Sequence, residues 1–154
     1  MSIASVGNIE KILERDGVYP SVTEGISMRP LFKTHRDMVI LERVSGKLKK
    51  YDVALYKKGE KYILHRVIGI DDEKNVYIIR GDNTYKKEYV PMSSVIARLT
   101  SFKRKGKSHT VDDTPYRIYA VFWNFIYPIR YLFHLARCVL VKIYRALFKK
   151  RGKR

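Results

Sequence analysis

The segment 61–70 reads KYILHRVIGI and is the longest of several short runs rich in Val, Ile, Leu and Tyr. Side chains on a β-strand alternate between two faces, so His65 is expected to share a face with Ile63 and Val67, and Arg66 to lie on the other. Glycine or charged turn sequences separate the remaining runs: MVILE (38–42), DVALY (52–56), VYIIR (76–80) and SVIARLTSF (94–102). No helix-length segment lies between these runs. The sequence therefore predicts a mainly β, compact antiparallel domain.

An amphipathic helix is predicted for the start of the chain, residues 1–22. Charged residues separate apolar residues that recur at helical spacing: Ile3, Val6, Ile9, Ile12 and Leu13. Asp16-Gly17 is a typical helix end. No uninterrupted apolar core follows the first methionine, so this segment is predicted neither to cross a membrane nor to act as a secretory signal.

The chain has 154 residues and one cysteine, Cys138. This length favours one domain with a core of its own, and a lone cysteine can form neither an internal disulfide nor a metal cluster. The sequence contains no metal-ligand spacing and no glycine-rich phosphate loop after a strand. No cofactor is therefore expected.

Charge is distributed unevenly along the chain. Lys and Arg outnumber Asp and Glu by 32 to 15, which gives a net charge of +17, and neither acid occurs from Thr114 onward. A charge of this size attracts anionic lipid, nucleic acid or acidic protein. The change in composition near 112–115 predicts a boundary between a β-rich domain, residues 23–112, and a basic tail, residues 113–154.

The tail is predicted to be a basic amphipathic helix that lies in a membrane interface. Its apolar stretch before Arg130 is shorter than the about 20 residues that a bilayer core demands. Helical spacing places Arg130, His134, Arg137 and Arg145 opposite an apolar stripe formed by Ile129, Leu132, Phe133, Ala136, Val139, Leu140, Ile143 and Leu147. Many aromatic residues and the final KKRGKR favour an anionic membrane surface. The alternative is that the stripe packs on the β-domain.

A candidate nucleophile, Ser27, lies between a glycine and a proline in EGISMRP, residues 24–30. Taken singly, this segment is a turn sequence and His65 is a buried strand histidine. Together the two residues form a candidate pair, because a serine hydroxyl needs a base within hydrogen-bond reach, ideally one that a third group orients. Two acids are candidates for that third group: Asp82, in the turn after VYIIR, and Glu88.

These residues resemble the sequence boxes of signal peptidase I, in that family's order. Ser27-Met28-Arg29-Pro30 is similar to its Ser-Met-x-Pro box, Arg36-Asp37 stands at its Gly-Asp position, segment 65–69 looks like its base-bearing strand, and Gly81-Asp82-Asn83 matches its Gly-Asp-Asn box. The resemblance covers about residues 24–101 and implies a domain of the LexA/signal peptidase type. Most bacterial members have a lysine as base, so His65 implies the Ser-His branch of archaea and the endoplasmic reticulum.

The resemblance also bears on the other site residues. In the Ser-His branch the orienting acid follows the Gly-Asp-Asn box, and counting from Asp82 leads to Glu88 in place of an aspartate. Asp82 is then expected to brace the loop, and it stays the alternative orienting acid. Gly25-Ile26 stands where members often carry Ser-Gly, so one oxyanion donor is missing and the backbone N–H of Ser27 is left. The N-terminal membrane anchor usual in the family is not predicted.

The sequence thus predicts a membrane-associated serine endopeptidase that cleaves a peptide or protein through an acyl-enzyme on Ser27, with His65 as general base. The resemblance implies an extended substrate with small side chains beside the cut. The alternative is a non-catalytic basic module that binds anionic lipid or, less favoured, nucleic acid. Without an export signal the cytoplasmic face of a membrane is expected by default, whereas the signal peptidases that the chain resembles act on the outer face.

Overall fold

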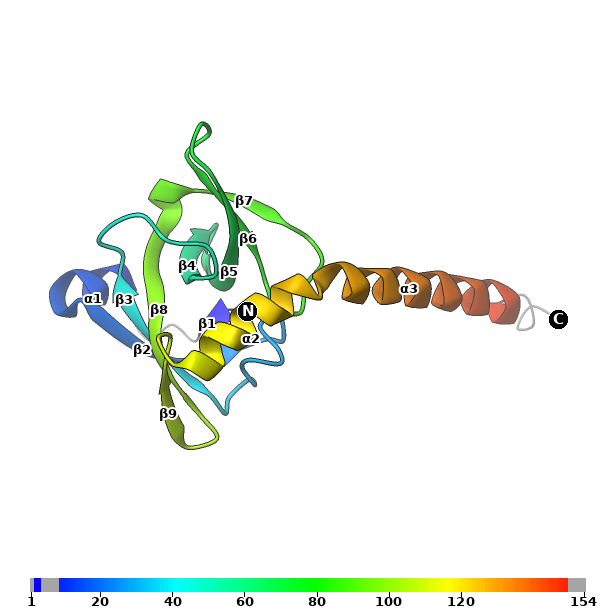
Figure 1. Ribbon diagram of the computed structural model, residues 1–154, viewed down its shortest axis with the longest axis horizontal. Coiled ribbons are helices and arrows are strands. Elements are labelled where there is room, and N and C mark those ends of the chain that lie inside the picture. The colour runs from blue at the N-terminus through cyan, green and yellow to red at the C-terminus, as the bar shows by residue number, and fades with distance from the viewer. Residues whose placement is uncertain (1, 4–8, 150–154) are drawn as a thin grey trace. The chain divides into compact units, whose positions relative to one another are not determined.

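A computed structural model describes residues 2–3 and 9–149 of the chain (Figure 1). The predicted mainly antiparallel β architecture is confirmed. The strands are β1 (Ser2–Ile3), β2 (Val18–Glu24), β3 (Met38–Arg43), β4 (Val53–Lys58), β5 (Lys61–Asp71), β6 (Val76–Arg80), β7 (Glu88–Pro91), β8 (Val95–Arg104) and β9 (Lys107–Thr110). The helices are α1 (Ile9–Asp16), α2 (Thr114–Phe125) and α3 (Tyr127–Lys149), with one 3-10 turn, η1 (Met92–Ser94).

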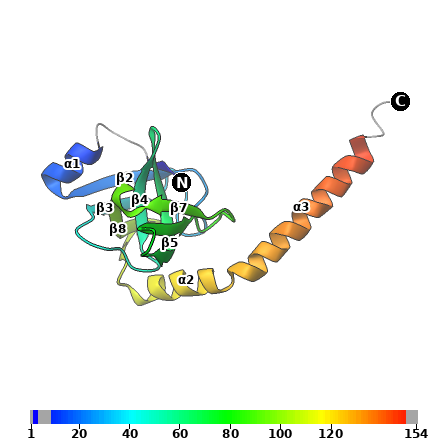
Figure 2. The same ribbon diagram turned by 90° about the horizontal axis from the view of Figure 1, so that it is seen from above.

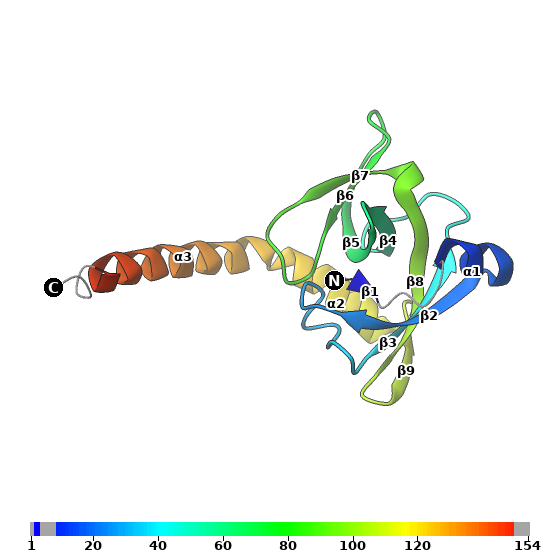
Figure 3. The same ribbon diagram turned by 180° about the vertical axis from the view of Figure 1, so that it is seen from behind.

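The strands form one sheet that closes on itself in part. Their order is β1-β2-β3-β8-β4-β5-β6-β7, and β9 pairs with β8 as a hairpin (Figure 3). β1 pairs with β2 and also with β5, where Ser2 lies opposite Ile63. The six strands from β1 to β5 in this order therefore make a ring, and β6 and β7 extend from it beyond β5.

The five predicted runs correspond to β3, β4, β5, β6 and β8, and burial explains their composition. In β4, Val53 and Leu55 belong to one core cluster, whereas Ala54 and Tyr56 belong to a second cluster on the opposite face. Both faces of this strand are thus covered, which accounts for an apolar run without polar alternation. Truncation of Leu55 to alanine is expected to cost about 2–5 kcal/mol of stability.

The alternation predicted for β5 is also present. Ile63 and Val67 pack against the second cluster, and Leu64 belongs to the first. His65 lies opposite Ala54 in the neighbouring strand and so shares the face of Ile63 and Val67. His65 and Arg66 are both buried, on opposite faces of the same strand.

The N-terminal segment differs from the prediction in two places. Helix α1 begins at Ile9 and lies beside β2 and β3 (Figure 2), with Ile9 and Leu13 in the core. The helical assignment of Ile3 is wrong, because Ile3 lies in β1, and Val6 lies outside the described residues. The predicted boundary at residue 22 falls inside β2. This strand escaped notice because its inward-facing side chains include the polar Ser21 and Thr23.

Two helices form the tail. α2 begins at Thr114, at the predicted change in composition, and Pro128 occupies the first turn of α3, where a missing backbone N–H costs nothing. The chain divides into two compact units, Met1–Val121 and Phe122–Arg154, so the unit boundary lies within α2 and not at residue 112. Among the described residues, no helix has the length and apolarity that a membrane span requires.

Candidate active site

Ser27 lies on a loop between β2 and β3 that buried side chains hold in place. Met28, Leu31 and Phe32 insert into the core, and the backbone N–H of Phe32 donates to the carbonyl of Met28 at 3.1 Å. Ser27 is half-buried and lies between the exposed Ile26 and the buried Met28. The packing of Met28 thus anchors the chain directly after Ser27.

The end of this loop is fixed by Asp37, the acid of the Arg36-Asp37 pair. Its carboxylate has no exposed surface, accepts from the backbone N–H of Lys33 at 2.8 Å, and forms a two-bond pair with Arg36 at 2.7 and 2.6 Å. Burial opposes its ionisation, but these bonds hold the pKa of Asp37 below its usual value. Asp37 thus fixes the end of the loop that carries Ser27.

Ser27 and His65, which are far apart in sequence, meet in the structure. The Ser27 hydroxyl oxygen lies 2.8 Å from Nε2 of His65, within hydrogen-bond distance. The His65 side chain is only 8% exposed, because it projects from β5 beneath the Ser27 loop. The structure thus brings together the two side chains that the sequence analysis paired.

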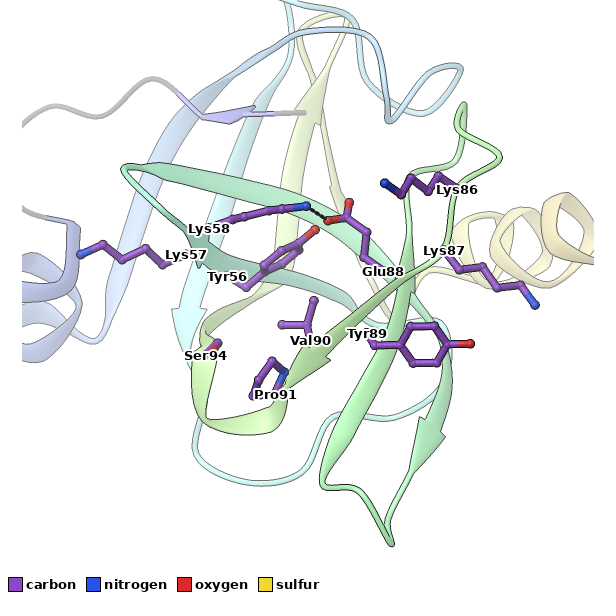
Figure 4. A pocket seen from close by; sticks show the side chains of 10 residues that line it. All are labelled: Tyr56, Lys57, Lys58, Lys86, Lys87, Glu88, Tyr89, Val90, Pro91 and Ser94. Carbon is purple, nitrogen blue, oxygen red and sulfur yellow. Dashed lines mark hydrogen bonds and ion pairs between the residues drawn. The ribbon is translucent and has the colours of Figure 1, made fainter.

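The other imidazole nitrogen faces two groups at slightly longer distances. Oε1 of Glu88, the first residue of β7, lies 3.5 Å from Nδ1, and the Tyr56 hydroxyl lies 3.4 Å from the same atom. Glu88 is held in turn by an ion pair with Lys58 (Figure 4). A carboxylate can only accept a hydrogen bond, so the proton of a neutral His65 belongs on Nδ1. Nε2 carries no proton in this tautomer and can accept a hydrogen bond from the Ser27 hydroxyl.

The electrostatics of the site favour this arrangement at neutral pH. The pKa of His65 is lowered to about 4, chiefly by burial; the charge of Lys58 also lowers this pKa, whereas the charges of Glu88 and Asp82 raise it. Burial opposes ionisation of Glu88, but Lys58 holds its pKa below the usual value. Burial and the charge of Glu88 raise the pKa of Tyr56. His65 is therefore a neutral imidazole beside a charged carboxylate and a protonated phenol.

Asp82, the other predicted acid, is engaged elsewhere. Its two oxygens accept from Nε and an Nη of Arg66 at 2.8 Å each, and Tyr119 donates to it at 2.9 Å. Arg66 also donates to the carbonyl of Tyr51 at 2.9 Å and to the hydroxyl of Tyr116 at 3.2 Å. The side chains of Arg66 and Asp82 are at most 2% exposed. Of the two acids, Glu88 thus faces Nδ1 of His65, whereas Asp82 is bound in a buried ion pair.

The Gly81-Asp82-Asn83 turn supports the Ser27 loop directly. The backbone N–H of Asn83 donates to the carbonyl of Ser27 at 2.7 Å, and its side-chain amide donates to Ile26 at 3.3 Å. A Cβ on Gly81 would lie 2.7 Å from the Ser27 carbonyl oxygen and 3.0 Å from Nε2 of His65. Only glycine therefore allows the turn to approach both members of the pair.

Sequence reasoning missed Tyr56, Lys58 and Arg66. The sequence held a signal for Tyr56 and Arg66. The hydroxyl of Tyr56 lies in the apolar run VALY and the guanidinium of Arg66 in KYILHRVIGI, and both groups need polar partners when those strands are buried. Lys58 carried no such signal, since it is an exposed lysine at a strand end.

Comparison with protein-family models gives no match for this chain, and no curated protein matches it. The likeness to signal peptidase I accordingly stays a prediction from the sequence boxes. Within residues 2–3 and 9–149, no group of three or more His, Cys, Asp or Glu side chains could hold a metal ion.

Proposed function

We propose that this protein is a serine endopeptidase in which Ser27 is the nucleophile, His65 the general base and Glu88 the group that orients His65. The observation that carries the proposal is the 2.8 Å contact between the Ser27 hydroxyl and Nε2 of His65, with Glu88 facing the opposite ring nitrogen at 3.5 Å. A hydroxyl, a neutral imidazole and a carboxylate in this sequence of contacts can perform acyl transfer.

In the first half-reaction the Ser27 oxygen attacks a peptide carbonyl carbon while its proton moves to Nε2 of His65. The resulting imidazolium is stabilised by the carboxylate of Glu88. Nε2 then gives the proton to the departing amine as the C–N bond breaks, which leaves an ester between Ser27 and the acyl part of the substrate. Because His65 has a pKa of about 4, it returns this proton readily.

In the second half-reaction a water molecule takes the place of the departed amine. His65 removes a proton from this water, whose oxygen attacks the ester carbonyl. The C–O bond to Ser27 breaks, Ser27 regains its proton from Nε2, and a carboxylic acid product leaves. The overall reaction consumes one water molecule for each peptide bond and needs no other co-reactant.

An extended peptide with small residues beside the cut is the proposed substrate, following the signal peptidase resemblance. Among the described strands, β7 pairs with β6 alone, so its second edge is available to an added strand. β7 begins with Glu88, so a peptide at this edge passes close to His65. Main-chain hydrogen bonds to a strand edge bind a peptide with little dependence on its side chains.

The proposal is tested with a defined library of short peptides incubated with the protein in mild detergent, followed by mass spectrometry of the products. We expect cleavage of a subset with small residues at the cut. In the presence of glycinamide, part of the acyl product should appear as the glycinamide adduct, because an amine can replace water as acceptor of the acyl group. Failure to cleave any peptide, or cleavage with no such adduct, would contradict an acyl-enzyme.

We also propose that α3 binds an anionic membrane surface. Leu132, Phe133 and Leu140 belong to its apolar stripe and are 65%, 74% and 66% exposed. The opposite side carries basic residues, and no acidic residue occurs in α3. An exposed apolar face backed by cationic side chains is the pattern of a helix that lies in a membrane interface.

Flotation with vesicles tests the membrane proposal. The protein should float with vesicles that contain phosphatidylserine and much less with neutral ones. A Leu132→Glu, Leu140→Glu variant should stay at the bottom of the gradient, whereas Tyr131→Glu, on the basic side, should float as the native chain does. Equal flotation of all three proteins would refute a role of the apolar stripe.

A further inference from the structure

A pocket of about 310 Å³ lies between the end of β4 and β7, beside the candidate active site (Figure 4). Tyr56, Val90 and Pro91 give it an apolar wall, and Ser94 adds a hydroxyl. In Figure 4 the side chain of Glu88 points, like that of Val90, toward Tyr56. The pocket thus has a firm apolar wall, because Tyr56 and Val90 are themselves almost completely buried.

Cationic side chains dominate the rim of this pocket. Four lysines line it, Lys57, Lys58, Lys86 and Lys87, against a single acid, Glu88. The charge of Glu88 is already compensated by its ion pair with Lys58, and Lys57 lies 3.2 Å from Glu10. A positive excess therefore remains on the side of Lys86 and Lys87, both of which are exposed.

The two exposed lysines are adjacent in sequence, but they are oriented differently. Lys86 extends to the side of the pocket where the Glu88 carboxylate and the Lys58 amine lie, whereas Lys87 extends away from it (Figure 4). An anionic group that enters the pocket would therefore meet Lys58 and Lys86, while its methylene groups contact Tyr56 and Val90. Aspartate and glutamate side chains have this combination of a short apolar stem and a carboxylate.

The pocket and the nucleophile are separated by a single imidazole ring. Tyr56 and Glu88, which line the pocket, lie 3.4 and 3.5 Å from Nδ1 of His65, and the Ser27 hydroxyl lies 2.8 Å from Nε2. One residue of an extended peptide spans about 3.3–3.6 Å. A peptide with its scissile carbonyl at Ser27 therefore reaches the pocket with a side chain roughly three residues away.

We propose that this pocket selects peptide substrates with an acidic side chain roughly three residues from the cut. The inference rests on the proposed function, which it deepens by assigning a charge to the substrate. Lys86 is the specificity residue, and Lys58 contributes while it holds Glu88. Opposite charge at this point steers the peptide and fixes its register, which is the usual effect of charge complementarity in binding.

Peptide binding to the Ser27→Ala variant tests the pocket without depending on cleavage. The probes are fluorescently labelled octapeptides of Ala and Gly that carry one Asp, Asn or Lys at each position in turn, and the readout is fluorescence anisotropy at low and high salt. At one or two adjacent positions Asp should bind about two- to fivefold more tightly than Asn, as expected for one exposed charge contact. This preference should weaken as salt rises.

Lys86→Glu and Lys87→Glu, each introduced into Ser27→Ala, form a matched pair with the same change in net charge. Lys86→Glu should abolish the preference for Asp and bind the Lys peptide instead, whereas Lys87→Glu should retain the preference. Equal affinity for Asp and Asn peptides in Ser27→Ala, or equal losses in both charge-reversal variants, would overturn the proposal.

Cleavage by the native chain separates this inference from the proposed function. A preference for Asp in binding, together with no cleavage of any peptide by the native protein, would support the pocket and refute the endopeptidase. Cleavage of Asp and Asn peptides at equal rates, with no binding preference, would refute the pocket and leave the endopeptidase standing.

Discussion

His65 and Arg66 are neighbours in β5, yet their side chains lie on opposite faces of the strand in different electrostatic environments. Arg66 is enclosed, with partners on Asp82, Tyr51 and Tyr116 at 2.8–3.2 Å. His65 lies 2.8 Å from the Ser27 hydroxyl and faces Tyr56 and Glu88 at 3.4 and 3.5 Å. The Arg66 face keeps a buried charge compensated, and the His65 face keeps a base uncharged.

This difference separates the two acids: Asp82 stabilises the fold in an ion pair with Arg66, and Glu88 faces the imidazole of His65. A buried ion pair with well-aligned hydrogen bonds resists removal of either partner, because the remaining charge is left without compensation. His65 is a neutral imidazole beside a carboxylate, and groups with displaced pKa values gather at functional sites. The following predictions separate the two faces experimentally.

The largest expected effect is on activity, at His65. His65→Gln keeps a polar side chain of similar size but has no basic nitrogen, so kcat/KM for peptide cleavage should fall by about 10³–10⁴-fold. The melting temperature should change little, because no buried charge is created. Retention of more than a tenth of native activity would rule out His65 as the base.

The next effect is on stability, at Arg66 and Asp82. Arg66→Gln or Asp82→Ala leaves the other charge buried without its partner and should cost about 3–5 kcal/mol in the free energy of unfolding. Urea denaturation measures this loss. A double variant, Arg66→Met with Asp82→Leu, should recover part of the stability. Single variants as stable as the native chain would contradict the structural role of the pair.

Glu88→Gln should act differently from the Arg66 and Asp82 variants: it should lower the cleavage rate and change the free energy of unfolding little. The amide keeps the shape of the carboxylate but cannot stabilise an imidazolium, so cleavage should slow by about 100-fold. Steady-state kinetics at pH 7 measure this effect, and urea denaturation provides the control. If Glu88→Gln is fully active, another group must orient His65.

Gly81→Ala should disturb the contact between the two site loops. The new Cβ would approach the Ser27 carbonyl oxygen to 2.7 Å, so the loops must move apart, at a cost of about 1–3 kcal/mol and with a longer contact between Ser27 and His65. Gly46→Ala is the matched control, because a Cβ at Gly46 meets nothing within 4 Å. Equal activity and stability of the two variants would show that the close approach at Gly81 has no consequence.

The smallest expected effect is a shift in pH dependence. Protonated His65 cannot accept the Ser27 proton, so kcat/KM should be level at neutral pH and fall as the pH drops through the His65 pKa of about 4. Lys58→Ala removes a charge that lowers this pKa, and its activity should therefore begin to fall at higher pH. Lys57→Ala, whose lysine pairs with Glu10, is the control. Circular dichroism at each pH checks that the protein stays folded.

Much of the fold could be predicted because strand runs of this chain are continuous and apolar. Five strands follow from their apolar runs, and the alternation of side chains around His65 follows from the two-residue period of a β-strand. β2 could not be predicted in the same way, since Ser21 and Thr23 face inward and obscure its pattern. β7 follows a lysine-rich loop and holds only four residues, too few to show alternation.

The site could be predicted in part. Ser27 and His65 lie in segments whose residue types and order suggested a pair, and the structure brings them together. The choice between Asp82 and Glu88 required the structure. On the opposite face of β5 from His65, the guanidinium of Arg66 forms an ion pair with Asp82. Tyr56 was within reach of prediction, because β4 and β5 are consecutive paired strands in which Ala54 lies opposite His65 and Tyr56 opposite Ile63. Lys58 was not, because it is an exposed lysine at a strand end.

The most direct test of the central claim is the cleavage rate of one susceptible peptide by the native chain and by Ser27→Ala, measured at equal concentration with both proteins shown to be folded. If the Ser27 hydroxyl attacks the peptide carbonyl, the variant should be slower by at least about 10³-fold. Turnover by Ser27→Ala at the native rate would contradict the account, because the hydrolysis would then need neither the hydroxyl nor its contact with His65.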